Sequence, residues 1–283
     1  MSSELRTKLI TEMNLHGLAP NTQRGYVESV KGLAAYYKMS PETLTDEQIR
    51  AYFQHLIEER KLTRSSCRRY LTGLIFFYRH VCGREVEDRF GLPHFRGEKK
   101  LPIVLSIEQV TRLLSCEHNL KHRVLLKTIY SAGLRVSEAV RLKPHHIESD
   151  PSRMLIRVED GKGKKDRYTV LSKNLLKELR LYWKKYRPGK WLFPGYGHDK
   201  HLSTIAASQV FYNAKKKAGI TKACGIHSLR HSFATHSLYR GTDLYTISKL
   251  LGHSSVKTTT IYLHIIPERF VELKSPLDHL DLG

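Results

Sequence analysis

The sequence reads His227-Ser-Leu-Arg230-His231, then Leu251-Gly252-His253, and then Tyr262. Arginine and histidine side chains commonly bind phosphate groups, and a tyrosine that follows them is a candidate nucleophile. Helical spacing places His227 and Arg230 on one face of a helix. The stretch therefore predicts a catalytic site for phosphodiesters.

The same histidines also permit a metal site. His227 and His231 are four residues apart, which is the spacing of zinc ligands on a helix. The zinc-protease pattern requires Glu after the first His, where this chain has Ser228, and no third ligand is evident in the neighbouring sequence. A metal-dependent nuclease stays open as an alternative. On its own, His231 is interpreted as a packing residue or as a support for a catalytic neighbour.

His253 and Tyr262 each have an ordinary structural interpretation as well. Gly252 can adopt the left-handed conformation that ends a helix, and a histidine after such an end is a favourable cation. Tyr262 lies among isoleucine and leucine residues, as a core tyrosine would. A phenol with a pKa near 10 needs adjacent cations or a base before it can attack phosphorus.

The charge of the chain indicates a polyanionic partner. Its 283 residues carry 48 Lys and Arg against 27 Asp and Glu, a formal net charge of +21. Each Lys or Arg placed on a phosphate releases condensed counterions, so nucleic acid is the leading partner. An anionic membrane surface is the rival, but no stretch approaches the roughly 18 apolar residues of a spanning helix. The first residues lack the apolar run of a signal peptide, which predicts a cytoplasmic protein.

The chain divides into two predicted domains. Residues 1–85 carry three helical patterns, residues 86–104 form a basic segment with Gly and Pro, and residues 105–283 follow. Thr45-Asp-Glu-Gln48 and Ser106-Ile-Glu-Gln109 are capping boxes that open helices. The four cysteines are scattered and match no zinc or disulfide pattern, so we interpret them as reduced thiols.

The second domain is predicted to be mostly helix with one small sheet. Helical patterns occupy residues 106–114, 124–132, 136–142, 175–186, 208–218, 228–239 and 244–251. Residues 155–158 and 168–171 are strand-like, and they flank Gly161-Lys162-Gly163-Lys164-Lys165. A small antiparallel hairpin fits this pattern.

Further cations accompany the opening motifs. Arg135 follows Ala132-Gly133-Leu134 at a helix junction, and Glu138 one turn later is interpreted as its structural partner. Lys162 lies between two glycines, where the backbone can approach a duplex closely. Other exposed cations are candidate DNA contacts or a solvated surface: Arg64, Arg68, Arg69, Lys99, Lys100, Lys164 and Lys165.

These motifs together resemble the tyrosine recombinase (phage integrase) family in order and spacing. The residues that carry the resemblance are Gly133-Leu-Arg135-Val-Ser-Glu138, Gly161-Lys162-Gly163, His227-Ser-Leu-Arg230-His231, Leu251-Gly252-His253 and Tyr262. The compact length is similar to that of Xer-like and simple transposon or integron-type members. The resemblance implies a clamp of a helical core-binding (SAM-like) DNA-binding domain and a mixed α/β catalytic domain with a C-terminal tail, mainly α with a small antiparallel sheet.

The resemblance also implies roles for individual residues. Arg135 and Arg230 would hold the scissile phosphate, His227 would take part in proton transfer at the nucleophile, and His253 would hydrogen-bond a phosphate oxygen. Tyr262 would attack the phosphate and form a 3′-phosphotyrosyl intermediate.

The same resemblance implies that Lys162 would be the general acid for the departing 5′-hydroxyl. Members of the family use no metal and no high-energy cofactor, because the covalent bond preserves the phosphodiester energy for religation. They act as tetramers on specific sites in double-stranded DNA and exchange strands through a Holliday junction, for integration, excision or resolution. This chain would form a homotetramer or pair with a related recombinase.

Alternatives remain at this stage. A type IB topoisomerase-like enzyme shares the phosphotyrosine chemistry, and a noncatalytic DNA-binding regulator would account for the charge but not for the polar motifs. The tail from Pro267 to Gly283 is expected to dock on a neighbouring protomer or to pack on its own domain.

Overall fold

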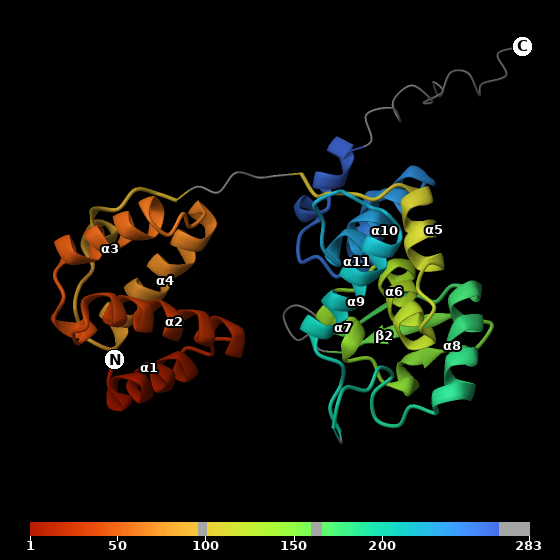
Figure 1. Ribbon diagram of the computed structural model, residues 1–283, viewed down its shortest axis with the longest axis horizontal. Coiled ribbons are helices and arrows are strands. Elements are labelled where there is room, and N and C mark those ends of the chain that lie inside the picture. The colour runs from red at the N-terminus through yellow and green to blue at the C-terminus, as the bar shows by residue number, and fades with distance from the viewer. Residues whose placement is uncertain (96–100, 160–165, 198, 266–283) are drawn as a thin grey trace, which may run out of the picture. The chain divides into compact units, whose positions relative to one another are not determined.

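The computed structural model describes residues 1–95, 101–159, 166–197 and 199–265 (Figure 1). The chain forms two compact units, Met1–Lys100 and Leu101–Gly283. Each unit has its own apolar core. The described elements are mainly helical with one small antiparallel sheet, so the predicted fold class is confirmed.

The first unit contains four α-helices: α1 (Ser3–Leu15), α2 (Pro20–Tyr37), α3 (Asp46–Glu58) and α4 (Arg64–His80), with the short 3₁₀ helices η1 (Pro41–Thr43) and η2 (Glu87–Gly91). Three of the α-helices follow the predicted patterns. Helix α1 was not predicted, although its buried residues Leu5, Leu9 and Met13 recur every four positions.

The predicted capping box at the start of α3 is confirmed. The Thr45 hydroxyl accepts a hydrogen bond from the Gln48 N–H at 3.3 Å, and the Gln48 side chain accepts one from the Thr45 N–H at 2.9 Å. Ile57 lies at the edge of the buried stripe of α3 and is exposed.

Part of the segment expected as a linker belongs to the first core. Val86, Phe90 and Phe95 are buried there. Phe95 stacks on Phe53 of α3 with ring centroids 5.8 Å apart. Burial of these three apolar side chains removes their surface from water and so stabilises this core. The first compact unit therefore extends past residue 85.

The second unit contains helices α5 (Ile107–Ser115), α6 (Leu120–Ala132), α7 (Val136–Val140), α8 (Lys173–Tyr186), α9 (Thr204–Lys217), α10 (His227–Tyr239) and α11 (Leu244–Leu251). The strands are β1 (Ile147–Glu148), β2 (Leu155–Val158) and β3 (Arg167–Val170), and the 3₁₀ helices are η3 (Pro144–His146), η4 (Val256–Thr258) and η5 (Thr260–Ile265).

The predicted hairpin is present as β2 and β3, which pair antiparallel with Leu155 opposite Val170. Strand β1 adds a third member to the sheet, in the order β1-β2-β3. Its two residues are too few to show the alternation by which a strand is recognised in sequence.

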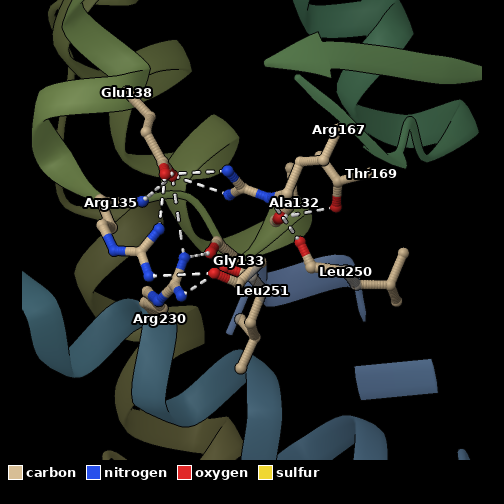
Figure 2. A network of polar contacts seen from close by, with 10 residues as sticks. Ala132, Gly133, Arg135, Glu138, Arg167, Thr169, Arg230, Leu250 and Leu251 are labelled. Carbon is tan, nitrogen blue, oxygen red and sulfur yellow. Dashed lines mark hydrogen bonds and ion pairs between the residues drawn. The ribbon is translucent and has the colours of Figure 1, made fainter. Parts of the chain in front are cut away.

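Helix α6 is the centre of the second unit and packs against α8 and α10. It ends at Gly133, which has the left-handed φ of +61°. Helices α10 and α11 and the segment η5 enclose a smaller apolar cluster that contains Phe233, Leu251 and Tyr262. The C-terminal ends of α6 and α11 are thereby brought to one side of α10 (Figure 2). Within the part of the chain that the structure describes, no helix is long and apolar enough to cross a membrane.

Candidate active site

One buried carboxylate, that of Glu138, joins three arginines (Figure 2). Glu138 lies in the first turn of α7, where it accepts a hydrogen bond from the Arg135 N–H at 2.7 Å. Its oxygens also accept bonds from the Arg135 guanidinium at 2.7 Å and from both terminal nitrogens of Arg167 at 2.8 Å. The Arg230 guanidinium lies 3.7 Å away. Glu138 is thus the structural partner that the sequence predicted for Arg135, and it holds two further arginines.

Glu138 is ionised at neutral pH in spite of its burial. Burial raises the pKa of this carboxyl, but the hydrogen bonds and charges of Arg167 and Arg135 outweigh it and lower the pKa to about 2. Three guanidinium cations and one carboxylate leave the cluster with a surplus of two positive charges. A phosphodiester, which carries one negative charge, complements such a site.

Arg230 is held by the ends of two helices. It projects from α10, is 4% exposed, and donates hydrogen bonds of 2.7 Å to the carbonyls of Gly133 and Leu251. These carbonyls lie at the C-terminal ends of α6 and α11, where backbone acceptors lack helical partners and the helix dipole is negative. Burial, followed by the charge of Arg135, lowers the pKa of Arg230 to about 10, so it stays protonated at neutral pH.

Arg167 is the site residue that the sequence interpretation missed. It begins β3, pairs with Glu138, and donates from Nε to the Leu250 carbonyl at 3.0 Å. It therefore ties the β2–β3 hairpin to both α7 and α11 (Figure 2). A signal was available, because strand alternation puts Arg167 on the same face as the buried Thr169. An inward-facing arginine needs a buried acidic partner.

His253 follows α11 at the predicted helix end. Gly252 has φ +64°, which confirms the left-handed stop. His253 Nδ1 lies 2.8 Å from the Thr259 hydroxyl. The preceding carbonyl, that of Gly252, lies 3.5 Å from the Arg135 guanidinium. The helix end therefore brings His253 next to the arginine cluster.

Tyr262 combines the two interpretations that its sequence context allowed. It is 2% exposed, and its ring packs in the small cluster with Phe233 and Leu251. Its hydroxyl lies 2.9 Å from Nδ1 of His231. Burial raises the pKa of the phenol, while the charges of Arg230 and Arg135 act in the opposite direction. The same residue is packed in a core and placed within the electric field of the arginines.

His227 begins α10 beside these cations. Part of its side chain is exposed at the protein surface, while protein surrounds the rest. This desolvation, and then the charges of Arg230 and Arg135, lower the pKa of His227. It is therefore neutral at neutral pH, and a neutral imidazole can either donate or accept a proton.

The remaining predicted residues separate into two groups. Arg64, Arg68 and Arg69 are exposed on α4. Lys162 and the other predicted contacts lie outside the described residues, namely Lys99, Lys100, Lys164 and Lys165. Among the residues that the structure describes, the one group of three potential metal ligands is His145, His146 and Glu159, which includes neither histidine of the opening motif.

Comparison with known proteins gives the family. A model described as the phage integrase family matches residues 104–269, and one described as the N-terminal SAM-like domain of phage integrases matches residues 5–88. The chain belongs to the phage integrase family. As a tyrosine recombinase, it is an enzyme that cleaves and rejoins DNA in site-specific recombination.

Individual relatives agree with this assignment. A putative integrase/recombinase, y4qK, of Sinorhizobium fredii (strain NBRC 101917 / NGR234) is 40% identical over 276 residues, which cover 98% of this chain and 89% of that protein. The tyrosine recombinase XerD of Rhizobium meliloti (strain 1021) is 32% identical, over 91% of this chain and 89% of that protein. A structure of the Tn1549 transposon integrase with circular intermediate DNA shares the fold, with a TM-score of 0.69, 17% identity, and coverage of 91% and 94%.

Proposed function

We propose that Tyr262 is the nucleophile of this recombinase and that Arg135 and Arg230 hold the scissile phosphate. In this proposal His253 hydrogen-bonds a nonbridging phosphate oxygen, and His227 takes part in proton transfer at the reacting oxygens. The tyrosine oxygen forms a bond to phosphorus as the bond from phosphorus to the 5′-oxygen breaks. The DNA strand is then joined to the protein through a 3′-phosphotyrosyl bond, which the freed 5′-hydroxyl can attack to reseal a strand.

The observation that carries the proposal is the place of the Tyr262 hydroxyl. It lies in the field of Arg135 and Arg230, whose positive charges lower the cost of forming a phenolate. The same cations neutralise the charge that gathers on the nonbridging oxygens as phosphorus becomes five-coordinate. Arg230 is fixed by two carbonyls and Arg135 by Glu138, so little reorganisation accompanies the reaction.

Lys162 is proposed as the general acid that protonates the departing 5′-oxygen. The support is its position in sequence, between two glycines in the connection from β2 to β3. The end of this connection is tied to the site, because Arg167 at the start of β3 pairs with Glu138. A lysine ammonium can act as a general acid when its pKa lies near the working pH.

The partner is proposed to be double-stranded DNA that carries specific recombination sites. The net charge of +21 and the complex of the Tn1549 integrase with DNA support this partner. We propose that the chain acts in the cytoplasm as a homotetramer, or together with a related recombinase. The first unit is proposed as the DNA-binding domain, and exposed cations of α4 as its contacts with phosphates.

The test is covalent capture of DNA. The protein is incubated with a library of nicked duplexes of randomised sequence, and protein-linked strands are isolated under denaturing conditions and sequenced. Wild-type protein is expected to form adducts with a defined set of duplexes, and Tyr262→Phe is expected to form none while its affinity for those duplexes stays unchanged. Tyr130→Phe removes a second hydroxyl in the same unit that also lies 2.9 Å from a histidine. This control is expected to form adducts at the wild-type rate.

Two results decide the assignment. Adducts of Tyr262→Phe would show that another residue is the nucleophile. Absence of adducts from the wild-type protein on every duplex would contradict the proposed reaction itself.

A further inference from the structure

The arginine cluster and the nucleophile leave one histidine of the opening motif without a role. His231 projects from α10, one turn after His227, and its Nδ1 lies 2.9 Å from the hydroxyl oxygen of Tyr262. The two ring centroids are 5.9 Å apart, so the contact is made by the polar edge of the imidazole rather than by stacking. Among the hydrogen bonds of the described residues, this is the contact made by the proposed attacking oxygen.

We propose that His231 is the general base that accepts the phenolic proton of Tyr262 as this oxygen attacks phosphorus. The inference rests on the proposed function, since it takes Tyr262 as the nucleophile. His231, rather than His227, is then the direct acceptor of the tyrosine proton, although the sequence motif alone assigns His231 to packing or support.

The surroundings of His231 keep its imidazole neutral. Burial lowers the pKa of His231 the most, and the charges of the neighbouring His227 and Arg230 lower it further, to about 4. The groups with which it interacts are His227 and Arg230 on its own helix and Tyr262 on η5. A neutral imidazole has one nitrogen that accepts. With the phenol as donor, that nitrogen is Nδ1.

The step balances in atoms and charge. The Tyr262 oxygen forms its bond to phosphorus, its proton moves to His231 Nδ1, and the bond from phosphorus to the 5′-oxygen breaks. The 5′-oxygen takes a proton from the general acid and leaves as a hydroxyl. In religation the imidazolium returns its proton to the tyrosine oxygen as that oxygen departs.

A base with a low pKa is sufficient for this step. The phenol becomes strongly acidic as its oxygen bonds to phosphorus, so the proton needs an acceptor only when the bond is forming. The anionic phosphodiester, once bound beside Arg230, offsets part of the positive charge that lowers the pKa of His231. Because the imidazole of His231 is already neutral, it can accept a proton across the physiological pH range.

The second unit contains a similar pair that serves as a control. The Tyr130 hydroxyl lies 2.9 Å from Nδ1 of His236, and burial lowers the pKa of that histidine too. The cation that acts on Tyr130 is Arg240, not the pair Arg135 and Arg230. The contact between tyrosine and histidine is thus shared, while the phosphate-binding cations accompany only Tyr262 in this comparison.

The first experiment measures single-turnover cleavage of a duplex captured by the wild-type protein. His231→Gln keeps a hydrogen-bond acceptor of similar size but cannot take up a proton, and His231→Ala removes both functions. Each variant is expected to form the Tyr262 adduct about 10²–10⁴-fold more slowly than wild type. His236→Gln is expected to cleave at the wild-type rate.

The pH profile separates proton transfer from packing. Wild-type cleavage is expected to be nearly constant between pH 6 and 9, because His231 is already neutral there. In His231→Gln the phenol must lose its proton to solvent, so the rate is expected to rise about tenfold per pH unit over this range. A variant that only disturbs packing would be slow at every pH.

A modified substrate separates the two ends of the reaction. A duplex with sulfur in place of the bridging 5′-oxygen has a leaving group that needs no proton. This substrate is expected to restore cleavage by Lys162→Ala but not by His231→Gln.

The outcomes distinguish the two proposals. Wild-type adducts together with equally fast adducts of His231→Gln would overturn the role of His231 and leave the nucleophile assignment intact. Rescue of His231→Gln by the sulfur substrate would also overturn it, because the defect would then lie at the leaving group. Absence of wild-type adducts would instead refute the proposed function.

Discussion

Glu138 is the residue whose charge lets three arginines lie together in a buried site. It is 8% exposed, and removal of one partner from a buried ion pair commonly costs about 3–5 kcal/mol. Glu138→Gln keeps the size of the side chain but leaves Arg135, Arg167 and Arg230 to repel one another. We expect it to lower the free energy of unfolding by about 3 kcal/mol at pH 7, measured by denaturant titration.

The pH dependence of this effect has a definite sign. The pKa of Glu138 is about 2 in the folded protein and about 4.3 in an unfolded chain. Its contribution is therefore fully present above about pH 4.3 and is lost as pH falls toward 2. The difference between Glu138→Gln and wild type is expected to shrink over this window. Glu178→Gln, at a partly exposed carboxylate between Arg123 and Lys127, is the control and should cost about 1 kcal/mol or less.

At the residue scale, the sequence predicted Arg135, its partner Glu138 and Arg230, but neither Arg167 nor the contact that His231 makes with Tyr262. The recognisable motifs contain Arg135, His227, Arg230, His253 and Tyr262. In the structure, the residues around these motifs lie close together. The bonds of Arg167 to Glu138 and of His231 to Tyr262 join residues 29 and 31 positions apart. Such contacts depend on how helices and strands pack in three dimensions, which local sequence spacing does not contain.

At the element scale, the ends of helices form the site. Gly133 closes α6 with φ +61°, and a Cβ atom added there would lie 2.4 Å from the Phe233 ring and 2.9 Å from Leu251. Gly133→Ala therefore combines a strained backbone with overpacking, at a cost of about 3 kcal/mol. Gly219 follows α9 with φ +64° and nothing within 4 Å of an added Cβ. Gly219→Ala is expected to cost only about 1 kcal/mol.

Thermal or denaturant unfolding of the two alanine variants measures this difference. Equal destabilisation would show that the close contact at Gly133 relaxes freely, and that only the backbone conformation matters. A larger loss in Gly133→Ala would show that the junction of α6 with α10 and α11 is tightly packed.

Elements with strong local signals were predicted well. The capping boxes at Thr45 and Ser106 open α3 and α5, and Gly252 ends α11. Helix α1 and strand β1 were missed for different reasons. The buried stripe of α1 consists of only three residues, Leu5, Leu9 and Met13, so its periodic signal is short. Strand β1 is stabilised by pairing with β2 rather than by its own two residues.

At the scale of the whole molecule, the net charge of +21 predicts binding to DNA that depends strongly on salt. Helix α4 presents Arg64, Arg68 and Arg69 on its exposed side, so it is the proposed contact with phosphates. Each phosphate contact contributes about 0.9 to the slope of log affinity against log salt concentration. The double variant Arg64→Ala/Arg68→Ala is therefore expected to reduce the slope by about 2 on a duplex of arbitrary sequence.

A matched control distinguishes this contact from a general effect of charge. Arg6→Ala/Lys8→Ala removes two exposed positive charges from α1 of the same unit. If α4 contacts phosphates directly, this control should change the slope by well under 1, because only charges placed against phosphates release condensed counterions. Fluorescence anisotropy between about 50 and 200 mM salt measures both slopes. Equal slopes for the two variants would mean that the total charge, and not the surface of α4, sets the affinity for DNA.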